Sequence, residues 1–260
     1  MKILPILLAT SLLCSIAGAS TLSTMETKTE KTHQVIILKL DDLVVDHDNE
    51  ELPVSSRWQR LTDFLKKSNI KASYGIIGYA LEEDNPDFFK WIKTLHDDGL
   101  IEFWNHGYKN KKTAEESGEF ENNSVKKQLS TLKRTQVLAK QKLGFDLHVF
   151  GAHWSGVNEA TIQALSTIPE IHMIYYEPID TTRFVFKYVM TLEDPPHVPN
   201  FAKFKTTYEK KAKNEACLAL QGHPNSWDDE RWEEFLKIIQ FLQSKGVVFM
   251  TPSEYTNRIE

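Results

Sequence analysis

The sequence predicts an α/β fold with a mainly parallel sheet, built as a single domain. Strand-like and helix-like segments alternate through most of the chain, which is the pattern of repeated β/α units. The 260 residues are 41% hydrophobic, enough to bury one substantial core. Candidate reactive side chains repeatedly follow apolar runs, and parallel strands would bring them to one rim, where such folds build active sites. These side chains are Asp41, Asp42, His106, His153 and His223.

Eight apolar, β-prone runs are the expected strands, and four stripes of apolar residues at helical spacing are the expected main helices. The strand candidates are residues 34–40, 71–77, 100–104, 147–151, 171–176, 184–190, 217–221 and 247–250. The helical stripes run through 58–65, 88–95, 125–143 and 232–242. Gly99 is expected to supply a left-handed helix cap, and the proline-rich residues 191–200 a long loop on the rim.

The first residues have the pattern of a secretory signal peptide. Lys2 precedes an apolar stretch over residues 3–16, and small residues follow up to Ala19. We therefore expect cleavage near Ala19, which makes residues 1–19 the signal peptide. The apolar stretch is too short for a stable membrane span, so a secreted or periplasmic protein is expected.

Charge and cysteine content limit the class of the mature protein. The net charge of −5 and the pI near 6.0 argue against a nucleic-acid partner. After signal removal only Cys217 remains, so no internal disulfide is expected. Residues 20–32 are polar without periodicity and predict a flexible linker, which leaves 33–260 as the catalytic domain.

Two motifs contain residue types that bind metals. Adjacent carboxylates at a strand end, Asp41 and Asp42, should point in opposite directions, so that one can bind a metal while the other faces substrate or water. If the chain turns helical after His106, then Asn110 shares its face, in the spacing used for paired metal ligands. The alternatives are a solvated strand end for the two aspartates and a satisfied core histidine for His106.

A third motif, QGHP, places His223 before a proline that fixes the backbone, and its imidazole could act as a general acid. Taken together and in order, the segments LKLDDL, EFWNHGYKN, VFGAHWSGVNEAT, LALQGHPNSW and VVFMTPSEY resemble the polysaccharide deacetylases, the NodB-homology group of carbohydrate esterases. The resemblance covers Val35 to Tyr255.

This resemblance implies a distorted β/α barrel of about seven strands that binds a divalent metal, usually zinc. By position, it makes Asp41 the general base and His223 the general acid. It makes Asp42 and His106 metal ligands, with Asn110 in the place of the third ligand. A bound cation would lower the pKa of its water and polarise an acetyl carbonyl.

The chain departs from the family pattern at three positions. Asn110 stands where the family has a second histidine, and an amide oxygen is a poorer zinc ligand, so a weakened site is expected. Gly151 replaces an arginine of many members, and His153 replaces a proline. His153 is therefore expected to contact substrate, with a substitute ligand or a packed rim histidine as alternatives.

Two tryptophans near these motifs are candidates for sugar binding. Trp154 and Trp227 lie beside the expected site, where aromatic faces commonly stack on sugar rings, although core packing is the alternative for both. Glu177 and Asp180 follow a strand and could orient His223.

The sequence therefore predicts a metal-dependent hydrolase of carbon-nitrogen, non-peptide bonds that deacetylates an N-acetylated carbohydrate. A second hypothesis is a degenerate member of the fold that binds carbohydrate without turnover, which Asn110 and Gly151 favour. A third is a metal-independent amide or ureide hydrolase. Whether the protein holds a metal separates the first hypothesis from the other two.

Overall fold

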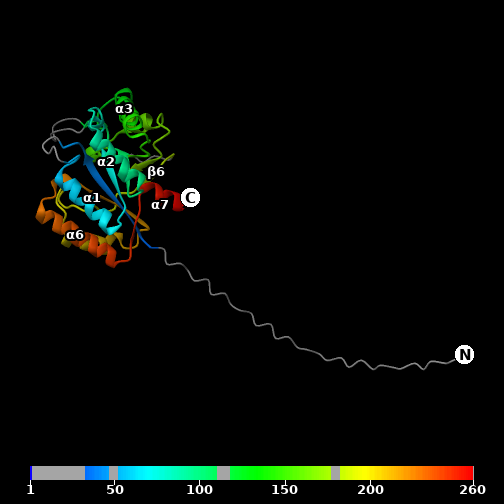
Figure 1. Cartoon of the computed structure of the whole chain (residues 1–260), viewed down its shortest axis with the longest axis vertical. Helices are drawn as coiled ribbons and strands as arrows, with labels where there is room; N and C mark the ends of the chain where they lie inside the picture. The colour runs from blue at the N-terminus through cyan, green and yellow to red at the C-terminus, as the bar shows by residue number, and fades with distance from the viewer. Residues whose placement is uncertain (2–32, 47–51, 110–117, 177–181, 260) are drawn as a thin grey trace. The chain divides into compact units, whose positions relative to one another are not determined.

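The computed structural model describes Met1 and residues 33–46, 52–109, 118–176 and 182–259. A parallel sheet curls into a half-barrel with strand order β6-β5-β4-β3-β2-β1-β7, and β8 pairs with the first residues of β1 (Figure 1). The strands are β1 Val35–Leu43, β2 Ala72–Ile76, β3 Ile101–Asn105, β4 Val149–Phe150, β5 Met173–Tyr175, β6 Phe184–Phe186, β7 Cys217–Gly222 and β8 Val248–Phe249. This confirms the predicted α/β class and the expected distorted β/α barrel of about seven strands.

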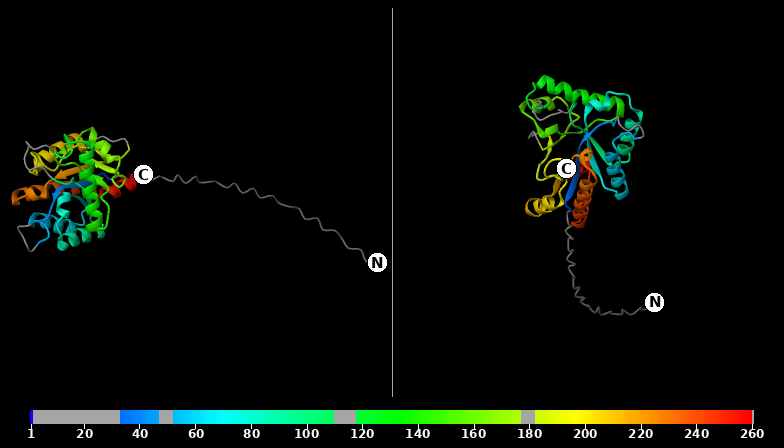
Figure 2. Two further views of the ribbon diagram at one scale, coloured as in Figure 1. Left: turned by 90° about the horizontal axis from the view of Figure 1, so that it is seen from above. Right: turned by 90° about the vertical axis from the view of Figure 1, so that its left-hand side faces the viewer.

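Helices cover the outside of the curled sheet (Figure 2). They are α1 Ser56–Ser68, α2 Pro86–Asp97, α3 Val125–Leu143, α4 Glu159–Leu165, α5 Phe201–Thr207, α6 Asp229–Ser244 and α7 Pro252–Ile259. Helices α1 and α6 lie side by side, with Phe64 packed edge-on against Trp232. No helix among these described residues is long and apolar enough to span a bilayer.

Local signals in the sequence set the helix ends. The side chains of Ser55, Ser124 and Asp228 accept hydrogen bonds from backbone N–H groups in the first turns of α1, α3 and α6. Gly144 ends α3 with φ of 89°, and Gly99 after α2 has φ of 65°, as expected for a left-handed cap. The polar side chains thus mark where these helices begin, and the glycines mark where helices end.

Strand β1 is buried on both faces, which explains its continuous apolar sequence. Ile36 and Leu38 face the layer between sheet and helices, whereas Val35 and Ile37 face the inside of the curl with Trp104. Lys39 and Asp41 continue this inner row at a spacing of two residues. The inner face thus changes from apolar to charged as β1 approaches the rim.

The loop predicted over residues 191–200 forms part of this rim. It contains a single antiparallel bridge between Glu193 and Pro199, and its residues line the cavities described below. The predicted signal peptide, 1–19, and linker, 20–32, lie outside the described residues apart from Met1.

Candidate metal centre and active site

The carboxyl ends of the central strands open into one cavity of about 310 Å³. The cavity is lined by residues at or after the ends of β1, β3, β4 and β7. The structure therefore brings together side chains from four strand ends. The lining residues are Asp41, Asp42, His106, His153, Trp154, Ser155, Pro196, His197, Gln221 and His223.

A bulge at the end of β1 turns both aspartates toward this cavity. The β1–β2 register shifts between Leu40 and Leu43, and Asp42 has φ of 67°, in the left-handed region. His106 Nε2 lies 3.3 Å from Asp42 Oδ1 and 3.7 Å from Asp41 Oδ2. The expectation that adjacent carboxylates point in opposite directions fails here, because the bulge breaks the alternation of the strand.

The hydrogen bonds of His106 determine which of its nitrogens can bind a cation. Its Nδ1 lies 2.6 Å from the carbonyl oxygen of Gly151, which can only accept, so Nδ1 carries a proton. In the neutral ring, Nε2 then presents a lone pair toward the oxygens of Asp41 and Asp42. His106 Nε2, Asp41 Oδ2 and Asp42 Oδ1 are then three hydrogen-bond acceptors that face one another. Such an arrangement is favourable only with a cation or a proton between them.

The hydrogen bond of His153 fixes the opposite ring nitrogen from that of His106. Its Nε2 lies 3.2 Å from Glu119 Oε2, so Nε2 donates to this carboxylate. Its Nδ1 is buried and has no hydrogen-bond partner among the residues that the structure describes. Burial lowers the pKa of His153, despite the opposing effect of Glu119, and the neutral ring therefore leaves Nδ1 with a free lone pair.

Gly107 permits the close approach of these groups. It has φ of 79°, and a Cβ atom there would lie 2.5 Å from Glu119 Oε2 and 2.6 Å from His153 Nε2. Glu119 also accepts hydrogen bonds from the backbone N–H groups of Tyr108 and Lys109, at 2.8 and 3.0 Å. One carboxylate thus links His153 to the loop that follows His106.

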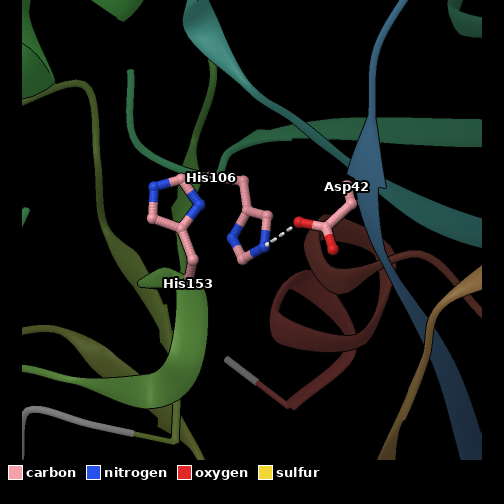
Figure 3. Close-up of side chains that lie close together, drawn as sticks. All are labelled: Asp42, His106 and His153. Atoms are coloured by element: carbon pink, nitrogen blue, oxygen red, sulfur yellow. Dashed lines mark ion pairs between the residues drawn. The ribbon is translucent and has the colours of Figure 1, made fainter. Parts of the chain in front are cut away.

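These residues fit a divalent cation. One ligand atom each from Asp42, His106 and His153 lies within 4.8 Å of the other two. His106 lies between Asp42 and His153, and a ring nitrogen of His153 faces it (Figure 3). Burial raises the pKa of Asp42, but the hydrogen bond and charge of His106 outweigh burial and hold this pKa below its ordinary value, so the carboxylate is ionised. Two imidazoles and one carboxylate form a common zinc ligand set.

Asp41 is held by other partners. Lys39 Nζ lies 2.7 and 2.6 Å from its two oxygens, and Gln221 Nε2 donates to Oδ2 at 2.7 Å. The side chains of Lys39 and Asp41 are 2% and 1% exposed. Burial raises the pKa of Asp41, but the charge of Lys39, followed by those of His106 and His223, holds this pKa below its ordinary value.

Lys39 also explains the departure at Gly151. A Cβ atom at Gly151 would lie 2.9 Å from the ring of Trp104, which leaves no room for a long side chain. Lys39 Nζ lies 4.9 Å from the centroid of the same ring. The cation beside Asp41 therefore comes from β1 itself, because an aromatic ring fills the space in front of β4.

His223 forms a buried pair with Glu193 of the rim loop. Its Nδ1 lies 2.7 Å from Glu193 Oε2, and Glu193 Oε1 accepts from the His223 backbone N–H at 2.7 Å. Its Nε2 faces Asp41 Oδ2 at 3.8 Å. Burial lowers the pKa of His223, but the hydrogen bond to Glu193 and the charge of Asp41 outweigh burial and raise this pKa above its ordinary value.

The two tryptophans have different environments. Trp154 is 54% exposed at the cavity and has φ of 57°, a strained conformation of the kind that clusters at functional sites. Trp227 is 1% exposed, stacks on Phe235 and donates from Nε1 to Glu193 Oε1 at 2.7 Å. The expectation that Trp227 stacks on a sugar therefore fails, because its ring faces are covered; it supports Glu193 instead.

Several functional side chains were missed by sequence reasoning. Lys39 had a readable signal, a single cation two positions before Asp41 in an apolar strand. Glu119 and Glu193 lie in loops, and their spacing in sequence does not indicate their partners. The predicted ligand Asn110 and the proposed orienting residues Glu177 and Asp180 lie outside the described residues.

Known structures share this fold. A family 4 carbohydrate esterase domain of a multidomain xylanase, from the hindgut metagenome of Trinervitermes trinervoides, has a TM-score of 0.60 at 18% identity, with 87% of this chain and 91% of that chain covered. A family 4 acetyl xylan esterase from Clostridium thermocellum, in complex with a cobalt ion, has a TM-score of 0.57 at 17% identity and covers 85% and 89%. A family 4 pseudoenzyme from Bacillus anthracis has a TM-score of 0.55 at 13% identity and covers 86% and 65%.

No protein-family model matches the sequence, and no curated protein matches it either. The chain has the fold of the family 4 carbohydrate esterases, which include polysaccharide deacetylases and pseudoenzymes. This agrees with the resemblance that the motifs predict.

We predict that metal affinity depends on His153 and on the carboxylate that orients it. Zinc titration by calorimetry should show a large loss of affinity for His153→Ala. For Glu119→Gln we expect a loss of about 10- to 100-fold, the usual effect of removing an outer-shell partner. His172→Ala, on an exposed histidine, is the control and should bind zinc like the parent. Unchanged affinity of His153→Ala would contradict this assignment and favour Asn110 as the third ligand.

We predict that Lys39 and Asp41 stabilise the fold only as a pair. Lys39→Met should lower the free energy of unfolding by about 3–5 kcal/mol, because it leaves a buried carboxylate without its cation. The double variant Lys39→Met/Asp41→Asn should lose less than the two single variants together. Lys71→Met removes a partly exposed pair with Glu254 and should cost at most about 1 kcal/mol. Urea unfolding measures all four, and strict additivity would contradict the pairing.

Proposed function

We propose that this protein is a metal-dependent polysaccharide deacetylase that removes acetyl groups from an N-acetylated carbohydrate. The observation that carries the proposal is the donor set of Asp42, His106 and His153, with Asp41 and His223 beside it in one cavity. We also propose that the metal is zinc, and that the protein is secreted or periplasmic, because its first residues have the pattern of a signal peptide.

Asp42, His106 and His153 would hold the metal, which when bound would lower the pKa of a water molecule and polarise the acetyl carbonyl. Asp41 is ionised and is fixed by Lys39 and Gln221, so its Oδ2 can accept a proton from the attacking water. Because Asp41 borders the cavity beside the donor set, the water need not move far to reach it.

His223 supports the second half of the reaction. Glu193 fixes Nδ1 as the donor within their pair and favours the charged imidazolium, so Nε2 also carries a proton. Nε2 faces the cavity toward Asp41, so His223 can donate a proton to an amine that departs within this cavity. Asp41 therefore acts as general base and His223 as general acid, and Trp154 provides an exposed ring for the sugar.

Two other functions have specific support. Hydrolysis of an acetyl ester needs the same water activation, and one structure of this fold is an acetyl xylan esterase. Binding without turnover is favoured by the pseudoenzyme of the same fold and by the departure at Gly151. The pairing of Asp41 with Lys39, and of His223 with Glu193, favours turnover, because each partner shifts the pKa in the direction that catalysis needs: down for the base Asp41 and up for the acid His223.

We predict that the zinc-loaded protein releases acetate from N-acetylglucosamine oligomers and that chelation abolishes the release. Asp41→Asn and His223→Ala should each lower turnover by about 10²- to 10⁴-fold, the usual contribution of a general base or acid. Both should retain zinc, whereas Asp42→Asn should lose it. Acetate release only from O-acetylated xylan would identify an esterase. Retention of the oligomers without release from any acetylated substrate would identify a binding protein.

We predict that Glu193 sets the basic limb of the pH profile. The general acid works only while it is protonated, and Glu193 raises the pKa of His223, so activity should persist to higher pH than an ordinary histidine allows. Glu193→Gln keeps one oxygen that can accept from Trp227 Nε1 and the His223 backbone N–H, as Oε1 does in the parent, but it removes the charge beside His223 Nδ1. The basic limb of kcat/KM should therefore move to lower pH. Asp194→Asn, on the exposed neighbour, should leave the limb in place. Coincident profiles for Glu193→Gln and the parent would exclude His223 as the general acid.

A further inference from the structure

A second hollow of about 380 Å³ adjoins the metal cavity. The two share Pro196, Gln221 and His223 among their lining residues. A carbohydrate whose acetyl group lies at the metal cavity would therefore extend past His223 into this second hollow. Its dimensions are within the range of ligand sites.

One wall of the second hollow is basic, although the protein as a whole is acidic. The wall consists of α5 and the following π-helical turn Tyr208–Ala212, from which Lys203 and Lys211 line the hollow. Residues 203–213 contain five lysines and one glutamate, within a chain of net charge −5. The glutamate, Glu209, is hydrogen-bonded to Lys245, at 2.6 Å. Such a local reversal of charge attracts anions.

The carboxylates that line the hollow do not cancel this charge. Glu193 is occupied by His223. Asp194 pairs with Lys203 at 3.0 Å, but the two side chains are 60% and 55% exposed, and pairs of this kind are weak and open easily. Among the described residues, no carboxylate lies within 4 Å of Lys211. Within the part of the chain that the structure describes, the hollow thus offers Lys211 without a carboxylate partner and Lys203, which an anion can share with Asp194.

The remaining lining suits a sugar ring. Tyr188 is 57% exposed and presents a ring, while Thr207 adds a hydroxyl group beside the lysines. An aromatic face with nearby hydrogen-bonding and cationic groups is complementary to a sugar that carries an acidic substituent.

We propose that the second hollow binds an anionic sugar residue, so that the substrate is an acidic N-acetylated polysaccharide. Lys211 and Lys203 contact its carboxylate or sulfate group, and Tyr188 stacks on its ring. This inference rests on the proposed function for the neighbouring acetyl group, but its binding step is independent of turnover.

The experiment compares calorimetric affinities of the zinc-loaded protein for three oligosaccharides of equal length. The first is an N-acetylglucosamine oligomer, the second alternates N-acetylglucosamine with glucuronic acid, and the third is a sulfated N-acetylated oligomer. Tighter binding of either acidic oligomer supports the proposal and identifies the acidic group. Equal or weaker binding of both overturns it.

Variants locate the preference. Lys211→Gln should weaken binding of the preferred acidic oligomer about two- to fivefold and leave the neutral oligomer unaffected, as expected for one exposed charge pair. Lys203→Gln/Lys211→Gln should weaken it further. Lys205→Gln, an exposed lysine of α5 outside the lining, is the matched control. An equal loss for Lys205→Gln and Lys211→Gln would overturn the proposal.

The same measurements separate this inference from the proposed function. A charge-dependent preference that Lys211→Gln removes, without acetate release from any oligomer, leaves the subsite in place and refutes the deacetylase. Acetate release at equal rates and affinities from neutral and acidic oligomers refutes the subsite and leaves the deacetylase in place.

Discussion

The site depends on keeping two adjacent carboxylates ionised in one cavity. Burial alone would raise the pKa of both Asp41 and Asp42, and two neighbouring anions also repel each other. The structure opposes both effects with a different partner for each carboxylate. Lys39 holds Asp41 through two hydrogen bonds, and the imidazole of His106 faces Asp42. The bulge at the end of β1 makes this division possible, because it brings both side chains to one side while giving them separate partners.

The same requirements can be met by residues from different strands. The cation against Asp41 comes from Lys39 within β1, whereas Trp104 leaves no room for a long side chain at position 151 after β4. A histidine after β4, His153, supplies a nitrogen that can bind a metal beside His106. Both side chains are held in place by neighbouring groups: Lys39 by the aromatic rings around it, and His153 by Glu119. Departures from a family motif therefore need to be judged by the position of the charge and not by the identity of one residue.

The sequence predicts the fold well because the apolar runs of the strands and the helical spacing of apolar residues are both clear. Apolar runs give the strands, and glycines and polar caps give the helix ends. It also predicts that the residues after β1, β3, β4 and β7 gather on one rim, because that follows from parallel strands alone. The direction of Asp42 and the burial of Trp227 could not be predicted, since the first depends on a bulge and the second on packing against α6. Glu119 and Glu193 reach their histidines from loops, and loop geometry leaves no periodic trace in a sequence.

The protonation states bear on whether this chain is an enzyme or a degenerate relative. A protein that only binds sugar needs aromatic faces and hydrogen bonds, and has no need of a buried carboxylate kept ionised by a buried lysine. Compared with apolar residues of similar volume, such a buried ion pair leaves the free energy of unfolding unchanged or lowers it. The Lys39–Asp41 pair and the Glu193–His223 pair meet in one small cavity, where Asp41 Oδ2 lies 3.8 Å from His223 Nε2. Stability alone gives no reason to keep two such pairs facing each other, whereas proton transfer between water and a departing amine does.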